Sequence, residues 1–170
     1  MKKLLMILGV LAAIAAPTIA QAGTTTGTLN VQLTLAGTCG VQNTTLDFGL
    51  YVNNAPPLFA VGSVDVICSA STTYDVDLDG GLHLLSSGRR LYFNSGGAGP
   101  LAVDNFIPYS LTKDASHTTT WGTCCSGTAI TGFMGNGMMQ RQPVYGEVFP
   151  TGAGTPPGVY TDTVMIIVTF

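Results

Sequence analysis

The sequence predicts an all-β protein, and three observations carry that prediction. Stretches with strand character recur at spacings near ten residues. Glycine contributes 22 of the 170 residues, and only 9% of the residues are charged. Beyond residue 22, no window shows the spacing of an amphipathic helix. Short strands separated by turns rich in glycine and proline are typical of a β-sandwich.

The first 22 residues predict a secretory signal peptide. A short basic start precedes an uncharged apolar run at residues 4–16, and Ala20-Gln21-Ala22 fits the small-residue rule for a cleavage site. The apolar run is too short for a membrane span, and no stop-transfer pattern follows it. We expect cleavage after Ala22, with cleavage after Ala20 as the alternative.

The exported part, residues 23–170, is expected to form one domain with a leading arm. It carries four basic and nine acidic residues, so its charge indicates no nucleic-acid partner. None of its segments is long and apolar enough for a membrane span. A hydrophobic content of 46% argues against disorder. We hypothesise that so few charges are tolerated because much of the surface is buried in a fibre or coat.

The first exported strand is expected at residues 28–35. Aliphatic residues stand at the odd positions from 29 to 35, and polar residues stand between them. This period of two indicates a strand with one buried face. At the other end, residues 164–170 predict a strand that stops at the chain terminus. Because chain ends fray unless a sheet holds them, both terminal strands need partners.

The remaining strands follow the same logic in chain order. Within residues 73–79, Tyr74, Val76 and Leu78 fall on one face and aspartates on the other. Pro108 indicates an edge strand or a bulge. Residues 114–139 are polar, glycine-rich and poorly periodic, and we expect no strand there. The expected strands are residues 45–51, 62–68, 73–79, 89–93, 106–111, 142–149 and 160–170.

All four cysteines lie in the exported part, where disulfides are permitted. Cys39 follows the first strand and Cys68 ends another, so we favour a bond between them over the other two pairing schemes. The adjacent Cys124 and Cys125 have no basic neighbour that would lower a thiol pKa. For this pair we favour a structural role, as a loop staple or a bond between subunits, over a reducible vicinal disulfide.

We tested the sequence for chemistry and expect no catalytic residue, metal site or cofactor. Residues 75–80 resemble the opening of a calcium loop, but Ser86 stands where the bidentate acid belongs. His83 and His117 are not at metal-ligand spacings. No nucleophile elbow or recognisable catalytic triad occurs, and Glu147 is the only glutamate.

An ordered set of short motifs resembles the spore coat protein U domain family, which includes the pilin subunits of archaic (Csu-type) chaperone–usher pili. The resemblance covers essentially the whole exported chain. The chain departs from it at the Cys124-Cys125 pair and in the glycine-rich residues 127–137. The matching motifs are residues 26–31 leading to Cys39, then 46–49, 64–68, 74–81, 90–91, 108–111 with 114–115, 121–122, 144–146 and 158–164.

The resemblance implies an incomplete immunoglobulin-like β-sandwich that is completed by a donor strand from a neighbouring subunit. A periplasmic chaperone would first lend a strand, and the outer-membrane usher would then exchange it for the arm of the next subunit. The implied donor is residues 23–36, and residues 37–170 would be the pilin domain. The side chains expected to enter the groove are Leu29, Val31, Leu33 and Leu35, with Gly27 in the same register.

From the alternation alone, residues 28–35 fit equally well as an ordinary first strand of their own sandwich. The resemblance favours donation, and with it a pilin of a secreted surface fibre that serves adhesion and biofilm formation. Its partners would be identical or related subunits in a head-to-tail filament. The alternatives are a spore or cell-surface coat protein of the same family and, in another class, a secreted carbohydrate-binding or hydrolytic β-sandwich.

Overall fold

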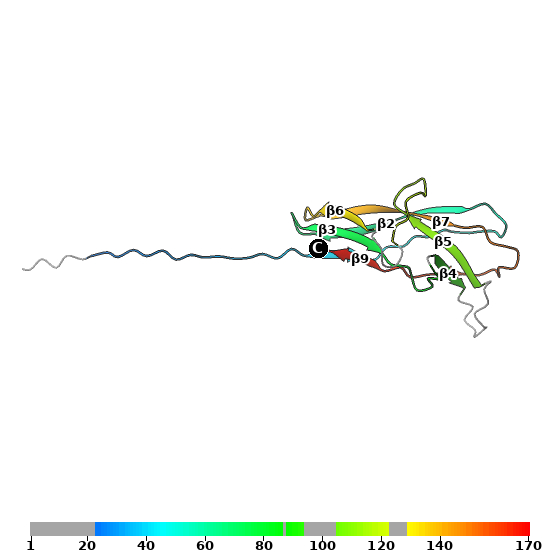
Figure 1. The fold of residues 1–170 in the computed structure, drawn as a ribbon, viewed down its shortest axis with the longest axis horizontal. Coiled ribbons are helices and arrows are strands. Elements are labelled where there is room, and N and C mark those ends of the chain that lie inside the picture. Colours follow the sequence, from blue (N-terminus) through cyan, green and yellow to red (C-terminus); the bar gives the residue numbers. More distant parts are fainter. Residues whose placement is uncertain (1–22, 87, 94–104, 123–128) are drawn as a thin grey trace, which may run out of the picture. The chain divides into compact units, whose positions relative to one another are not determined.

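The computed structural model describes residues 23–86, 88–93, 105–122 and 129–170 (Figure 1). It divides into two units, Met1–Thr34 and Leu35–Phe170. In the first unit, residues 23–34 carry no secondary structure and are exposed. The second unit contains all the strands described below.

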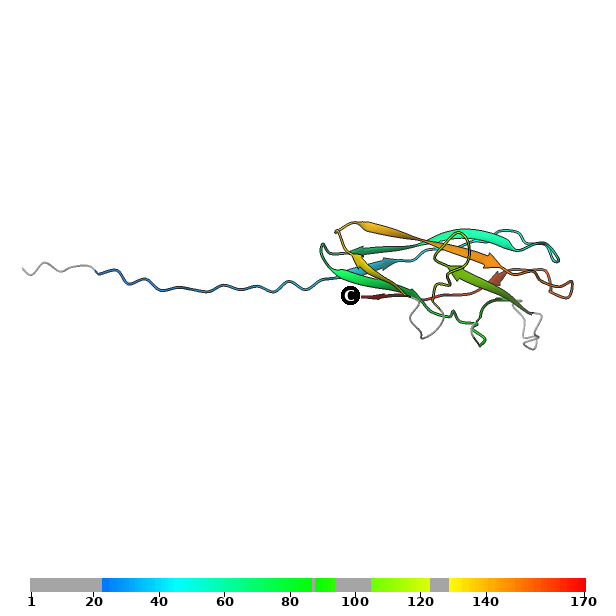
Figure 2. The ribbon, with the colours of Figure 1, turned by 45° about the horizontal axis from the view of Figure 1, so that its top comes forward.

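The second unit consists of two antiparallel sheets that pack face to face (Figure 2). The six-stranded sheet, here called sheet A, runs in the order β1 (Cys39–Gln42), β2 (Leu58–Cys68), β7 (Met139–Val148), β5 (Phe106–Thr112), β4 (Arg89–Phe93) and β8 (Tyr160–Thr161). The three-stranded sheet, here called sheet B, runs in the order β6 (Ile130–Met134), β3 (Thr73–Leu78) and β9 (Ile166–Thr169). The predicted all-β class is therefore confirmed.

The core lies between the two sheets and is built by alternating residues of their inner faces. Valine and aromatic side chains dominate it because β-branched and aromatic residues pack well on a pleated surface. The alternation predicted for β3 holds, since Tyr74, Val76 and Leu78 are all buried. The other buried apolar residues are Val64, Val66, Cys68, Ile107, Tyr109, Leu111, Trp121, Val144 and Val148.

The ladder between β2 and β7 sets the length of the domain. It runs without a break from the pair Leu58–Val148 to the pair Ile67–Met139. At about 3.4 Å per residue, its two ends lie roughly 30 Å apart. Figure 2 shows the C-terminus at one end of the domain and the loops at residues 49–57 and 149–159 at the other.

A disulfide joins Cys39 to Cys68, as the sequence predicts. The two residues are also direct partners in the β1–β2 ladder. The bond closes a loop with a sequence separation of 29, which is worth roughly 3–4 kcal/mol in the chain-entropy model. It ties the short edge strand β1 to the fully buried end of β2.

Arg89 is a buried cation that joins three segments of the domain: its own strand β4, the end of β3 and the segment that carries Trp121. It is only 2% exposed, and its guanidinium donates hydrogen bonds to the carbonyl oxygens of Asp79 (2.9 Å), Leu78 (3.1 Å) and Trp121 (2.9 Å). Burial lowers the pKa of Arg89, while the nearby carboxylates of Asp79 and Asp162 oppose that shift. The planar fork of donors is what allows one side chain to satisfy three backbone acceptors.

The prediction of a strand at residues 45–51 is wrong. This segment instead crosses the inner face of sheet A, and the side chains of Leu46 and Phe48 pack against the core. Room for them exists because Gly62 and Gly146 lack a Cβ: an added Cβ would lie 3.0 Å from Leu46 and 2.8 Å from Phe48. The alternation of side chains therefore indicates correctly that this segment packs against the core. It does not show that the backbone of the segment forms no hydrogen-bonded ladder with another strand.

The final strand predicted at residues 160–170 is divided in the structure. β8 pairs with β4 in sheet A, and β9 pairs with β3 in sheet B. Residues 162–165 lie between them, where the chain passes from one sheet to the other. A change of sheet cannot be read from the alternation, because the inward-facing positions keep the same period on both sides of it.

Two further expectations need correction. β6 lies in the stretch where no strand was expected, and its signal is weak because Gly132 has φ +82° and the β3–β6 register shifts between Tyr74 and Val76. Pro108 lies in β5, which is an interior strand. Pro108 pairs with Arg90 in the β4–β5 ladder, while its carbonyl oxygen accepts from Phe149 N–H (3.1 Å) on the β7 side. The missing N–H falls on that β7 side, one residue before the β5–β7 ladder begins at Tyr109, so no donor within that ladder is lost.

Replacing Arg89 tests the role of the buried guanidinium. We expect Arg89→Lys to lower the stability of the full chain by about 1–3 kcal/mol, because an ammonium group cannot serve all three carbonyls and one is left unpaired. The midpoint of urea denaturation measures the effect. Arg141→Lys is the control, since the Arg141 side chain is 67% exposed and should shift the midpoint less. Equal shifts in the two variants would contradict the assignment.

Candidate functional site

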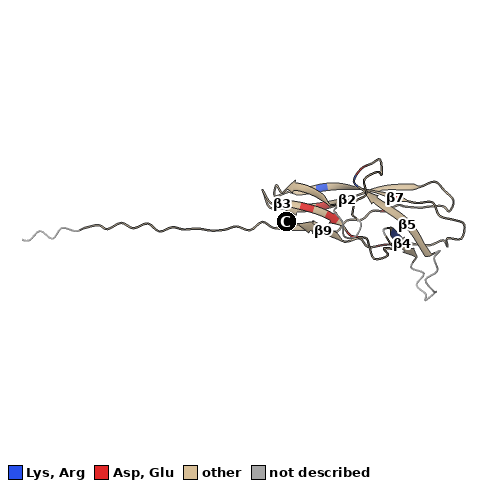
Figure 3. Cartoon of the chain, viewed as in Figure 1, with Lys and Arg blue, Asp and Glu red and all other residues tan. Residues whose placement is uncertain are grey.

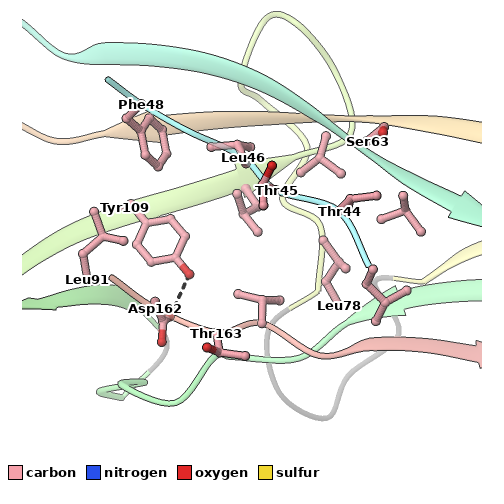
Figure 4. Close-up of a pocket in the computed structure, with 15 residues that line it drawn as sticks. Thr44, Thr45, Leu46, Phe48, Ser63, Leu78, Leu91, Tyr109, Asp162 and Thr163 are labelled. Carbon is pink, nitrogen blue, oxygen red and sulfur yellow. Dashed lines mark hydrogen bonds between the residues drawn. The ribbon is translucent and has the colours of Figure 1, made fainter. Parts of the chain in front are cut away.

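An apolar groove opens between a segment that crosses the inner face of sheet A and a segment that leads into β9, the edge strand of sheet B. Residues 44–48 form one wall and residues 162–166 the other, and the cavity between them has a volume of about 320 Å³ (Figure 4). Its lining draws on both sheets. The apolar lining residues are Leu46, Phe48, Val64, Leu78, Leu91, Leu111, Val144, Val164 and Ile166.

The second wall presents an unpaired backbone edge to this groove. Residues 163 and 165 direct their backbone groups toward the β3 side: Asp79 N–H donates to Met165 O (3.0 Å), and Leu82 N–H donates to Thr163 O (3.1 Å). The direction of the backbone N–H and C=O groups alternates along an extended chain. The backbone groups of Val164 and Ile166 therefore point away from β3, toward the groove. Among the described residues, no strand pairs with the groove side of β9. The edge is therefore open to a further strand.

The first wall also has unused backbone groups. β1 ends at Gln42, and residues 43–48 have no backbone ladder with another described strand. Phe48 is fixed instead by its side chain, which meets Tyr109 edge to face with ring centroids 6.2 Å apart. A strand lying in the groove would thus find apolar side chains beneath it and free backbone groups beside it.

One end of the groove carries a buried polar cluster. The Tyr109 hydroxyl donates to Asp162 Oδ2 (2.7 Å), while Asp162 Oδ1 accepts from Leu82 N–H (3.0 Å) and lies 3.0 Å from His83 Nδ1. Burial raises the pKa of Tyr109 above its ordinary value of 10.0, and the bond to Asp162 adds to the shift. Both oxygens of the Asp162 carboxylate have a partner. The cluster therefore holds the start of the segment 162–166 in place.

The predicted donor residues all lie in an exposed, extended arm. Four aliphatic side chains are almost fully exposed: Leu29 (87%), Val31 (86%), Leu33 (88%) and Leu35 (89%). Gly27 is exposed as well, and an added Cβ there would meet nothing within 4 Å. Exposed apolar side chains at every second position form an unpartnered stripe, which is rare on a monomeric protein.

The other predicted site residues are placed as follows. Cys39 and Cys68 form the disulfide, whereas Cys124 and Cys125 lie outside the described residues. Among the described residues, no group of three histidine, cysteine or acidic side chains could hold a metal ion. In the same part of the chain, no helix is long and apolar enough to cross a membrane.

Sequence reasoning missed the cluster of Tyr109, Asp162 and His83. Tyr109 and Asp162 are 53 positions apart in sequence, and His83 lies 79 positions from Asp162. Each residue falls within or beside a motif that resembles the family, but nothing in the sequence links them. Only the packing of β5 against the segment between β8 and β9 brings them together.

The fold and the groove define an all-β domain whose sandwich is open along one edge. The model of the Spore Coat Protein U domain family matches residues 25–167. The chain belongs to this family. It is similar to Protein U of Myxococcus xanthus, with 34% identity over 167 residues that cover 89% of this chain and 88% of that protein.

Among solved structures, the chain is similar to one in the chaperone–tip adhesion subunit pre-assembly complex CsuC–CsuE, from the archaic chaperone–usher Csu pili of Acinetobacter baumannii. The TM-score is 0.50 and the sequence identity 21%, and the match covers 81% of this chain. This chain spans only 40% of the length of the matched chain. At this identity the likeness establishes the fold alone.

The polar cluster leads to a prediction about alkaline pH. Because the pKa of Tyr109 is raised in the folded state, its contribution to stability is complete below about pH 10 and is lost as the pH rises further. Tyr109→Phe should therefore flatten the alkaline loss of stability. At pH 7 it should cost roughly 1–3 kcal/mol, since Asp162 loses a buried donor.

Urea denaturation of both proteins between pH 7 and pH 11 measures this difference. The pKa values of Tyr74 and Tyr160 are also raised by burial, so the variant should retain part of the alkaline loss. An unchanged pH profile in Tyr109→Phe would refute the assignment.

Proposed function

We propose that this protein is a structural subunit of a secreted surface fibre and that its subunits join by donor-strand exchange. One pairing of observations carries the proposal. The same chain has an exposed aliphatic stripe at residues 29–35 and an apolar groove with unpaired backbone edges. The groove lacks a strand, and the stripe lacks a surface that covers it. Strand addition to an open sheet edge is a common mode of recognition.

In the proposed contact, residues 23–36 of one subunit lie in the groove of the next. Leu29, Val31, Leu33 and Leu35 enter the apolar floor, and Gly27 lies in the same register. Burying four aliphatic side chains contributes on the order of 6–12 kcal/mol before the entropy cost of association. Backbone hydrogen bonds to the free edge at Val164 and Ile166 add to this and hold the register.

The contact joins two different surfaces, an arm and a groove, so it does not close on itself. Repeating it produces a head-to-tail filament. The proposed role is therefore structural rather than catalytic, with adhesion and biofilm formation as the functions of the fibre. The predicted signal peptide at residues 1–22 fits export to the periplasm and then to the cell surface.

The proposed partners during assembly are a periplasmic chaperone and an outer-membrane usher. An open groove with unpaired edges invites aggregation, so a subunit in transit needs a temporary strand. Support comes from the fold likeness to a structure of a chaperone with a pilus subunit. The chaperone would fill the groove until the arm of the next subunit replaces it.

A charge in the arm tests the proposal. We expect Leu33→Asp to stop fibre growth, because the groove would have to bury an unpaired carboxylate at a cost of several kcal/mol. The complex with the chaperone should form normally, since the groove of the variant is unchanged. Detergent-resistant polymers on gels and copurification of the chaperone are the two measurements.

Gln32→Asp is the matched control for this experiment. It adds the same charge one position away, on the polar face of the arm, and should still give fibres. Normal fibres from Leu33→Asp, or equal loss in both variants, would count against donation by this face.

A coat protein is the second candidate, and the description of the family favours it. The same arm and groove could join subunits in a layer around a spore or cell. Electron microscopy of cells that express the chain distinguishes the two: thin filaments are expected for a pilin and a continuous layer for a coat.

A further inference from the structure

The two ends of the domain share a property that donor-strand exchange does not use. Both carry exposed apolar side chains, and neither carries a charged side chain. The arm-base end consists of residues 35–38, 69–72, 134–140 and Phe170, and the loop end consists of residues 49–57 and 149–159. Figure 3 shows acidic residues on β3 and basic residues on β4, and the sequence places no lysine, arginine or acidic residue in the two sets of residues named above.

The arm-base end is held together by backbone hydrogen bonds. Ser69 N–H donates to Thr38 O (2.9 Å), and Gly137 N–H donates to Cys68 O (2.9 Å). Gly135 N–H donates to Thr72 O (2.8 Å), which joins the β6–β7 turn to the β2–β3 turn. Residues 35–37 and Phe170 line one cavity with the β2–β3 turn. These segments therefore form one surface around the base of the arm.

Methionines dominate the exposed apolar area of this surface. Met134 is 60% exposed, Met138 is 70% exposed and Met139 is 48% exposed, while Phe170 is 62% exposed. Methionine is ordinarily a buried residue, and clusters of exposed methionine are typical of protein-binding surfaces. Three methionines in and next to the β6–β7 turn therefore indicate a docking surface at the arm-base end.

The loop end is equally apolar and is preorganised. Leu50 is 90% exposed, Val52 is 65% exposed and Val159 is 72% exposed. The two loops are bonded to each other, because Asn54 N–H donates to Thr151 O (3.1 Å) and Asn53 Nδ2 donates to Thr155 O (2.8 Å). This end therefore presents a fixed surface, and a partner would need little ordering of the loops to bind it.

The connection between the arm and its domain is so short that strand donation would bring the domain of the donor close to the domain of the acceptor. Leu35 is the last of the four donor side chains in the arm, and Cys39 begins β1 only four positions later. Four residues of extended chain span at most roughly 13–14 Å. The connection also lacks slack, since Thr38 N–H donates to Ser69 Oγ (3.0 Å) and Gly37 packs against Thr72. A donor whose Leu35 lies in a groove must bring its arm-base end to the mouth of that groove.

One end of the groove is free to receive it. Toward Phe170 the groove leads to the acceptor's own arm base. At its other end, Phe48 leads directly into the loop at residues 49–57, and Asp162 follows shortly after the loop at residues 149–159. The mouth available to an incoming arm therefore lies beside the loop end.

We propose that the arm-base end of each subunit docks on the loop end of the next, which makes a second, apolar contact between copies of this chain. This inference rests on the proposed function, because donor-strand exchange brings the two ends together. The contact excludes water from Met134, Met138 and Leu50 and limits the bending of the filament at each junction. Since neither surface carries a charged side chain, the contact should depend only weakly on salt.

Site-specific photocross-linking in assembled fibres tests this contact. A benzophenone amino acid at position 138 should join that position to a peptide from residues 49–57 or 149–159 of the adjacent subunit, as identified by mass spectrometry. The same group at position 61 is the control, because Val61 is 67% exposed but is the fourth residue of β2 and lies outside the arm-base end. Fibres that form normally but give no product between position 138 and either loop, or an equal amount of product with residues 149–159 from position 61, would overturn the docking.

A second variant separates this contact from strand donation. With the cross-linker at position 50, Met138→Glu should abolish most of the product while detergent-resistant polymers persist. Val61→Glu should leave both unchanged. A full cross-link in Met138→Glu would refute the methionine contact alone, whereas the absence of any polymer from the unmodified chain would refute the proposed function and the docking with it.

Discussion

The constraint on which the rest of the structure depends is the open seam between residues 43–48 and residues 162–166. Both segments place apolar side chains into the core, yet neither has a strand beside it on the groove side. A core left open along one edge exposes apolar surface, which is costly in water, and unpaired backbone groups, which can pair with the strands of other chains. The domain must therefore be completed by another strand or remain vulnerable to aggregation.

Several features of the fold keep that seam open and regular. The disulfide fixes β1 beside β2, so the first wall starts from a rigid point. Arg89 joins Leu78 and Asp79 to Trp121, and Asp79 in turn bonds to Met165 in the second wall. The cluster of Tyr109 and Asp162 fixes the far end. A groove held in this way is preorganised, which lowers the entropy cost of accepting a strand.

The few charged residues are distributed unequally between the two ends of the domain and its flanks, by which we mean the outer faces of the strands between those ends. The flanks retain a few charged residues, including the Asp65–Arg141 pair, in which Arg141 lowers the pKa of Asp65. The ends retain none and expose methionine, leucine and valine instead. A subunit whose ends carry no charged side chain and whose flanks are more polar is suited to stacking in one direction, because apolar contact stabilises the ends and charge keeps the flanks solvated.

The sequence by itself determined the all-β class, the inward face of β3, the pairing of Cys39 with Cys68 and the alternation of the arm, because each depends on neighbouring residues or on period-two patterning. Only the tertiary structure decided that residues 45–51 form no ladder, that the last strand changes sheets, and that Tyr109 meets Asp162 and His83. Those outcomes depend on which strands become neighbours and on glycines, such as Gly62 and Gly146, that make room for a crossing segment. Alternation reports which way a side chain faces, but not which strand lies beside it.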